Sequence, residues 1–428
     1  MKLEIEKSRL VLYFRAALSL AVLLGIFWLG THRGLYRAYF ADMTFAIFTS
    51  CFFVALLRIR FRLTEVLGAV AFGLVLLLAD VRILGYAASW ESALSLLGLA
   101  ALGLLTFRVI WWEGQQRRLA VFTLVPLLLL HSAGWFNFVV HSWTAKAQPA
   151  VLDLYLYSFD ASMHVQLPFL VGQLFNRCIP FFLVCLIAYL ILEVAIALTY
   201  AGCLVDDRKT ALSAFAAFFI AGPIGVVCYN LFPALGPKYV FQAQFPWHPL
   251  TIEQVRHLKV EAVVLPGLRN AMPSLHAGWA YLICWYSRRL SLLERIMAAA
   301  ILVFTLFATL GAGEHYFIDL VVALPFTVFV ISLTTLLVHR ARASFGMPLL
   351  VGLALTLAWF AALHFGLRTF WTNAAIPWAA CLLTMAACFW MGARLAAEES
   401  KTPVEKSWPE NDVRTSPLAD HKGSSVAG

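Results

Sequence analysis

Long apolar runs, separated by short polar segments, cover most of the chain. A helix needs about 20 apolar residues to cross the hydrocarbon core of a bilayer, and the runs are close to that length. Strand-like alternation of polar and apolar positions is absent, and lipid accepts only helices or closed barrels. The pattern therefore predicts an all-α, polytopic transmembrane helix bundle of about 12 spans. The predicted spans are 10–30, 40–57, 63–81, 92–112, 119–140, 178–200, 211–231, 274–286, 296–310, 316–338, 347–365 and 374–391.

The composition supports a membrane location. Of the 428 residues, 62% are hydrophobic and 13% are charged, with a mean hydropathy of +0.81, whereas soluble domains are about half apolar and a quarter charged. The net charge of +9 does not indicate nucleic-acid binding, because Lys and Arg collect in segments such as "EGQQRR" and "HRAR" between the spans. By the positive-inside rule, this distribution predicts that both termini are cytoplasmic.

Polarity divides the chain into zones. N-terminal transmembrane helices are predicted for residues 1–140, and a polar, amphipathic segment that we expect at the membrane interface occupies 141–177. Nearly all polar residues with possible chemistry fall in 178–342, which is therefore the candidate catalytic core. C-terminal transmembrane helices are predicted for 343–394, and the polar residues 395–428 are typical of a disordered cytoplasmic tail.

Two carboxylates stand out in the interfacial segment. Asp153 and Asp160 are seven residues apart, so they share one face if the segment is helical. They could bind a polyol acceptor, but we favour the interpretation that they form the solvated face of an interfacial helix.

The eight cysteines are scattered singly, mostly in apolar runs, and lack the spacing of metal ligands. They resemble small buried hydrophobic residues. The sequence therefore predicts neither a metal nor another cofactor.

Three polar segments are predicted to face the non-cytoplasmic side: "YNLFPALGPKY", "LRNAMPSLHAGWAY" and "GAGEHYFIDLVVALP". In the second, Pro273 suits the first turn of a helix, which then includes Ser274 and His276. The unpaired N–H groups of such a turn bind anions, and Arg269 just upstream can add a charged clamp. An ordinary helix start with an interfacial histidine would present the same residues.

The third and first segments supply further candidates. His315 and Asp319 are four residues apart and lie within reach on one helix face. An aspartate bonded to one imidazole nitrogen leaves the other free to attack. A structural polar pair is the alternative, but ionisable groups at membrane depth are costly and usually functional. Lys238 is either a point charge for phosphate or a snorkelling interfacial lysine.

Together these residues predict phosphoryl transfer through a phosphohistidine. His315 would attack phosphorus, and His276 would protonate the leaving oxygen. The positive charges and N–H groups that hold the phosphate oxygens would come from Lys238, Arg269 and Ser274.

The motif pair resembles a known family. "PSLH", with His315 of "HYFID" 39 residues after His276, is similar to two signature motifs of the type 2 phosphatidic acid phosphatase (PAP2) superfamily. The variants "NAMPSLH" and "GEHYFIDLVVALP" look most like its inositol phosphorylceramide synthase branch. The resemblance covers about residues 178–342 and implies a six-helix catalytic core, a metal-free site on the periplasmic, extracellular or lumenal side, and the same roles for His315, Asp319 and His276. Its implied partners are membrane lipids, a phospholipid or other lipid-phosphate substrate and a hydroxyl acceptor.

Two positions depart from the family pattern. The phosphatases carry an arginine six residues before the nucleophilic histidine, where this chain has Thr309. Their first motif places Arg-Pro seven residues after a lysine, whereas Phe245 and Pro246 follow Lys238 at that distance. The phosphate-binding arginines of the phosphatases therefore have no direct counterparts here, and Arg269 is the candidate to compensate.

Other functions fit parts of the sequence. With water as the acceptor the protein would be a lipid phosphatase, and with a lipid or polyol hydroxyl it would be a phosphotransferase. Apolar runs containing Glu193 and Asp80 would suit a transporter, although no internal repeat is visible. A non-catalytic lipid-binding protein and a metal hydrolase are further alternatives, the latter without a third ligand near the His315 and Asp319 pair.

Overall fold

The structure is a computed structural model that describes residues 11, 13–19, 21, 52–55, 62–83, 90–339 and 345–400. Within these residues the elements are helices, apart from one antiparallel pair of two-residue strands, β1 (Ala150–Val151) and β2 (Val263–Val264). Every predicted span from residue 63 onward corresponds to helix, whereas those at 10–30 and 40–57 lie largely outside the described residues. The all-α prediction is confirmed.

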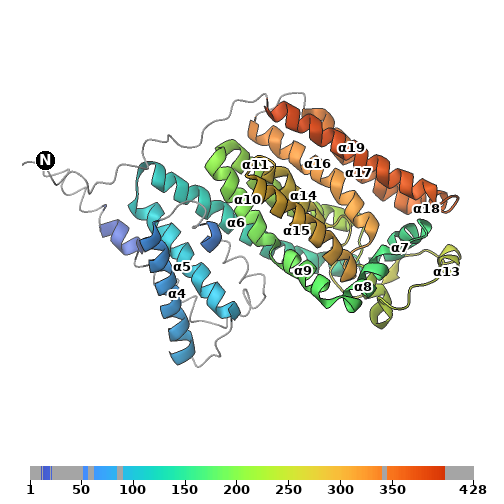
Figure 1. Cartoon of the computed structure of the whole chain (residues 1–428), viewed down its shortest axis with the longest axis horizontal. Helices are drawn as coiled ribbons and strands as arrows, with labels where there is room; N and C mark the ends of the chain where they lie inside the picture. Colours follow the sequence, from blue (N-terminus) through green and yellow to red (C-terminus); the bar gives the residue numbers. More distant parts are fainter. Residues whose placement is uncertain are drawn as a thin grey trace, which may run out of the picture.

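The first described helices stand at one side of the molecule (Figure 1). They are α4 (Leu63–Ile83), α5 (Trp90–Trp111) and α6 (Gly114–Ala147), and each packs against the next. The buried guanidinium of Arg108 on α5 donates from Nε to Glu65 on α4 at 2.8 Å. Helix α6 then contacts α11 and joins this group to the main bundle.

The main bundle surrounds α16, which contacts helices from several parts of the chain (Figure 1). Local capping sets some of its helix starts. The Asp207 carboxylate, for example, accepts from Lys209 N and Thr210 N at 3.1 Å at the start of α11. The bundle helices are α9 (Ile179–Leu190), α10 (Leu192–Asp206), α11 (Arg208–Leu231), α14 (Leu275–Ser287), α15 (Leu292–Gly311) and α16 (Phe317–His339).

The number of spans is supported only in part. Among the described residues, five helices are long and apolar enough to cross a membrane, or six if the bent pair of α8 (Leu167–Arg177) and α9 is one span. The predicted span at 178–200 is divided at Ile191 into α9 and α10, and α14 has only 13 residues. The apolar run at 178–200 is therefore broken into two helices, whereas α14 is as short as the predicted span 274–286.

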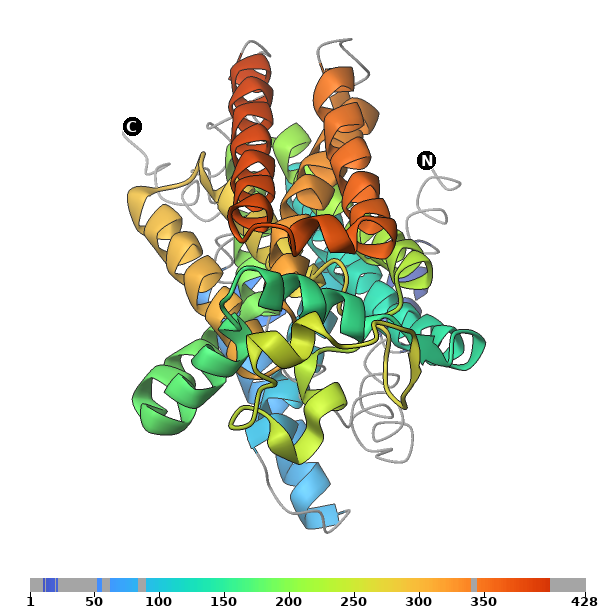
Figure 2. The same ribbon diagram turned by 90° about the vertical axis from the view of Figure 1, so that its right-hand side faces the viewer.

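A layer of short elements covers one end of the bundle (Figure 2). It contains α7 (Asp153–Ser162), α8, α12 (Pro237–Phe241), α13 (Ile252–Arg256) and the two strands. Helix α8 meets α9 at a bend of 116°, and its buried residues are grouped on one face. The layer is placed directly over the ends of α15 and α16, where the polar segments identified in the sequence lie.

The C-terminal helices hold α7 from the other side. They are α17 (Gly346–Phe365), α18 (Leu367–Phe370) and α19 (Ala375–Ser400), and both α17 and α19 pack against α16. Trp371 Nε1 donates to Ser158 Oγ at 3.0 Å, and Trp378 Nε1 donates to Met163 O at 3.2 Å. Helix α7 is therefore enclosed between the bundle and the C-terminal helices.

Candidate active site

The three polar segments of the sequence meet beneath the layer of short elements. Hydrogen bonds between backbone groups join each segment to the other two. They run from Asn270 N and Ala271 N to Ala234 O (3.1 and 3.2 Å), from Lys238 N to Gly313 O (3.0 Å) and from Ser274 N to Asp319 O (3.3 Å). The three segments, which are distant in sequence, therefore lie together in the fold.

The start of α14 places Ser274 and His276. Ser274 is the N-cap, and its hydroxyl accepts from Ala277 N at 3.3 Å. Pro273 precedes this cap, so the prediction that it occupies the first helical turn was wrong. The reason is that serine is a strong N-cap residue and stops the helix from extending back to the proline. His276 does lie in the first turn of α14, as expected.

A tight turn between α15 and α16 presents His315. Thr309 O accepts from Glu314 N and His315 N at 3.1 and 3.2 Å, and Gly313 adopts the left-handed region, with φ of +69°. Thr309, which occupies the position of the phosphatases' arginine, therefore contributes to the turn through its backbone. The His315 side chain is buried.

Hydrogen bonding determines which nitrogen of His315 is free to react. Nδ1 lies 3.0 Å from Ala271 O, and because a carbonyl only accepts, Nδ1 carries the hydrogen. Asp319 Oδ2 is 3.4 Å from the same nitrogen and accepts from Tyr316 N at 2.8 Å. The imidazole is thus oriented by a carbonyl as well as by the expected aspartate, and the lone pair is on Nε2.

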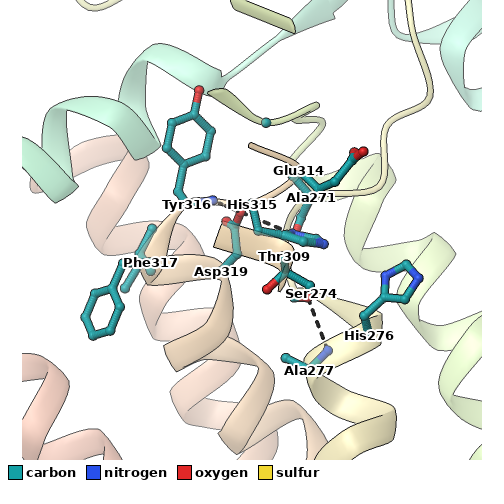
Figure 3. A network of polar contacts seen from close by, with 12 residues as sticks. Ala271, Ser274, His276, Ala277, Thr309, Glu314, His315, Tyr316, Phe317 and Asp319 are labelled. Carbon is teal, nitrogen blue, oxygen red and sulfur yellow. Dashed lines mark hydrogen bonds and ion pairs between the residues drawn. The ribbon is translucent and has the colours of Figure 1, made fainter. Parts of the chain in front are cut away.

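The two histidines face one another across the site (Figure 3), with ring centroids 6.3 Å apart. His276 also stacks on Tyr189 of α9, with a centroid distance of 4.4 Å and an interplanar angle of 25°. Trp279, one turn further along α14, contacts His276 edge-on. Tyr189 was not predicted from the sequence, because it is a single hydroxyl-bearing residue within an apolar run. No neighbouring residue distinguishes it from an ordinary tyrosine of a membrane helix.

Asp153 is buried and holds the first polar segment. Its carboxylate accepts from Leu235 N at 3.0 Å, from Gly236 N at 2.7 Å and from the Tyr316 hydroxyl at 3.2 Å. Burial raises the pKa of Asp153 to about 6, although these hydrogen bonds act in the opposite direction. The interpretation of Asp153 as part of a solvated face was therefore wrong.

Asp160 is likewise buried, which corrects the same interpretation. Its two oxygens accept from Phe317 N at 2.7 Å and Ile318 N at 3.2 Å, at the start of α16. A carboxylate at a helix N-terminus satisfies unpaired N–H groups and interacts favourably with the helix dipole. Asp160 thus holds the start of α16, which lies two residues after His315. Asp160 itself is on α7, a helix distant in sequence.

The two predicted phosphate-binding cations differ in their surroundings. Lys238 lies at the edge of the site, where Nζ forms an ion pair with Glu314. Arg269 is only 2% exposed, and its guanidinium donates to backbone carbonyls, including Gln148 O and Pro149 O at 2.8 Å and Leu265 O at 3.0 Å. Lys238 is therefore close to His315, whereas the hydrogen bonds of Arg269 are made to the surrounding loops.

The surroundings of His315 favour its neutral form. Burial, the largest influence, and the Lys238 charge lower its pKa to about 4, while Glu314 and the Ala271 carbonyl act in the opposite direction. An imidazole with this pKa is uncharged near neutral pH, so its Nε2 lone pair is available as a nucleophile.

Comparison with known proteins relates part of the chain to one family. Residues 154–333, from α7 into α16, match the family model of the PAP2 superfamily, whereas no curated protein and no solved structure matches the chain. The described part of the chain is therefore all-α, residues 154–333 are similar to the PAP2 superfamily, and the apolar helices indicate an integral membrane protein. The match supports lipid phosphatase or phosphotransferase activity.

Proposed function

We propose that the protein is a lipid phosphotransferase of the inositol phosphorylceramide synthase type, working through a phosphohistidine on His315. The observation that carries this proposal is the convergence of His276 and His315, 6.3 Å apart between ring centroids, within the region that matches the PAP2 superfamily. In this proposal a phosphorus centre is held between the His315 nucleophile and the His276 proton donor.

In the first step, His315 Nε2 attacks phosphorus and forms a P–N bond. The bond from phosphorus to the leaving lipid oxygen breaks, and His276 gives that oxygen a proton. In the second step, His276 takes a proton from the acceptor hydroxyl, whose oxygen attacks phosphorus while the P–N bond breaks. Both histidines are thus returned to their starting states, and no reactant other than the donor lipid and the acceptor is needed.

The phosphate oxygens need positive partners in both steps. Lys238 and the N–H groups at the start of α14, capped by Ser274, are proposed to supply them. Arg269 is proposed to act structurally instead, because its donors are engaged with backbone carbonyls. Asp319 is proposed to orient His315 together with the Ala271 carbonyl.

The proposal places the site on the periplasmic, extracellular or lumenal side, with both termini in the cytoplasm. The end of the bundle that carries the histidines also carries the amphipathic helix α8, which is typical of a helix lying along a membrane surface. A substrate phosphate at the lipid headgroup level could then reach His315 without crossing the bilayer.

The reaction can be tested with headgroup-labelled phospholipids. These are incubated with purified protein and with inositol, ceramide or another hydroxyl acceptor. A phosphotransferase moves the label to the acceptor, whereas a phosphatase releases it to water in the presence of every acceptor. Denaturation during turnover should trap label on the protein in a form that is stable to base and lost in acid, as expected for a P–N bond.

His315→Ala should abolish both the trapped label and turnover. His276→Ala should form the intermediate slowly from alkyl esters but much faster from a nitrophenyl ester, whose leaving group needs no proton. Turnover that survives in His315→Ala would refute the mechanism. Transport of lipid that survives in that variant, without turnover in the wild-type protein, would favour a carrier.

A further inference from the structure

Glu314 directly precedes the proposed nucleophile, and its carboxylate binds the one cation placed at the edge of the described site. Oε1 pairs with Lys238 Nζ, and Oε2 accepts from the Tyr239 hydroxyl at 3.3 Å. Figure 3 shows the Glu314 side chain extending from the same turn as His315. A carboxylate here is unexpected in a phosphate site, because like charges repel.

The backbone fixes this ion pair in place. Lys238 N donates to Gly313 O at 3.0 Å. Gly236, with φ of +123°, lies so close to the turn that a Cβ there would be 2.3 Å from Glu314 O. The segment carrying the lysine and the turn carrying the glutamate therefore pack as one unit, and the pairing does not depend on two freely moving side chains.

The ion pair also remains accessible to a ligand. The Lys238 side chain is 37% exposed and that of Glu314 is 21% exposed, in contrast to the buried His315 beside them. Partly exposed ion pairs contribute little to stability, so an incoming phosphate can displace the carboxylate from the lysine at a small cost.

We infer that Glu314 competes with the substrate phosphate for Lys238, and so limits how tightly the site holds anions. This inference rests on the proposed function. In the empty site Glu314 neutralises the lysine. When a phosphate binds, Lys238 turns to it and Glu314 is left as a repelling charge that favours release of the phosphorylated product.

Glu314→Gln tests this, because the amide retains the shape of the side chain and can still accept from Lys238 but carries no charge. Direct titration of purified protein with inorganic phosphate and with tungstate should show about fivefold tighter binding to this variant, the change expected for loss of a partly exposed ion pair. Glu253→Gln is the matched control, since it removes the same charge from the exposed surface of α13. It should leave both affinities unchanged.

The inference requires that the increase in anion affinity depends on Lys238. Adding Lys238→Gln to Glu314→Gln should remove the increase in affinity, and thermal unfolding of each variant checks that the fold is intact. Unchanged or weaker anion binding in Glu314→Gln, or an increase that survives without Lys238, overturns the inference. The titration needs no turnover, so tighter binding in Glu314→Gln with no activity on any lipid would instead count against the proposed function.

Discussion

Asp160→Ala should loosen the start of α16 and displace His315. The substitution removes both acceptors of Phe317 N and Ile318 N, which lie 2.7 and 3.2 Å from the carboxylate. Each buried donor left unpaired costs about 1–3 kcal/mol. Asp160 is buried, so its carboxylate carries a desolvation cost of its own, and this burial raises the pKa of Asp160 well above its ordinary value. Because the variant no longer bears that cost, we expect a loss of about 2–3 kcal/mol in the free energy of unfolding.

The kcat of Asp160→Ala should fall by more than the loss of folded protein explains. A displacement of about 1 Å at a reacting group can cost about 100-fold in rate, so kcat should fall by about that factor even at temperatures where the variant is folded. Headgroup-transfer kinetics and thermal unfolding of the same preparation measure the two effects. Asp160→Asn, which retains one acceptor oxygen, should lie between the wild-type protein and Asp160→Ala in both measurements.

Ser158→Ala is the control on the same helix. It removes the acceptor of Trp371 Nε1 but leaves the bonds from α16 to Asp160 intact. It should cost about 1 kcal/mol of stability and leave kcat nearly unchanged. If Asp160→Ala retains wild-type kcat, or if Ser158→Ala loses as much activity, the argument that Asp160 positions His315 fails.

Three further predictions concern His315 and Arg269. With a phosphodiester substrate, the acid limb of kcat/KM that reports protonation of His315 should lie near pH 4, because burial lowers the pKa of His315 to about 4. An acid limb near the ordinary value of about 6.5 would contradict this. The same shift makes the free energy of unfolding depend on pH. Between about pH 6.5 and pH 4 the unfolded chain binds a proton at His315 more readily than the folded chain does. The contribution of His315 to the free energy of unfolding is therefore complete above about pH 6.5 and falls as the pH drops toward 4. Arg269→Gln should lower the free energy of unfolding by about 3 kcal/mol, because hydrogen bonds to backbone carbonyls are lost. The KM should stay close to the wild-type value. Unchanged stability with a large rise in KM would show instead that Arg269 binds the substrate phosphate.

The candidate catalytic residues could be proposed from the sequence because their signals are local. His276 follows a proline and an N-cap serine, and His315 and Asp319 are one helical turn apart. Such patterns depend only on helix geometry and need no knowledge of the tertiary fold. The ends of the helices were predicted less accurately, since α14 begins at Leu275 after the N-cap Ser274 and does not include Pro273.

The supporting residues depend on tertiary contacts and could not be assigned in this way. Asp153 and Asp160 have the spacing of a polar helix face, and that spacing is the same whether the face meets water or the backbone of α16. Arg269 likewise has the type and position expected for a phosphate ligand, and only the surrounding carbonyls reveal its other partners. Hydropathy also gave no sign of the break at Ile191, because the residues on both sides of it are apolar.

Helix α7 links the site to the last part of the chain. Trp371 and Trp378 bind it from outside the region that matches the PAP2 superfamily, while Asp153 and Asp160 of α7 accept hydrogen bonds from Gly236 N and from Phe317 N at the start of α16. During synthesis the chain emerges from its N-terminus, so both histidines enter the membrane before α17 and α19 exist. Under the proposed function, the newly made chain therefore carries its two reactive histidines before the contacts of Trp371 and Trp378 that hold α7 can form.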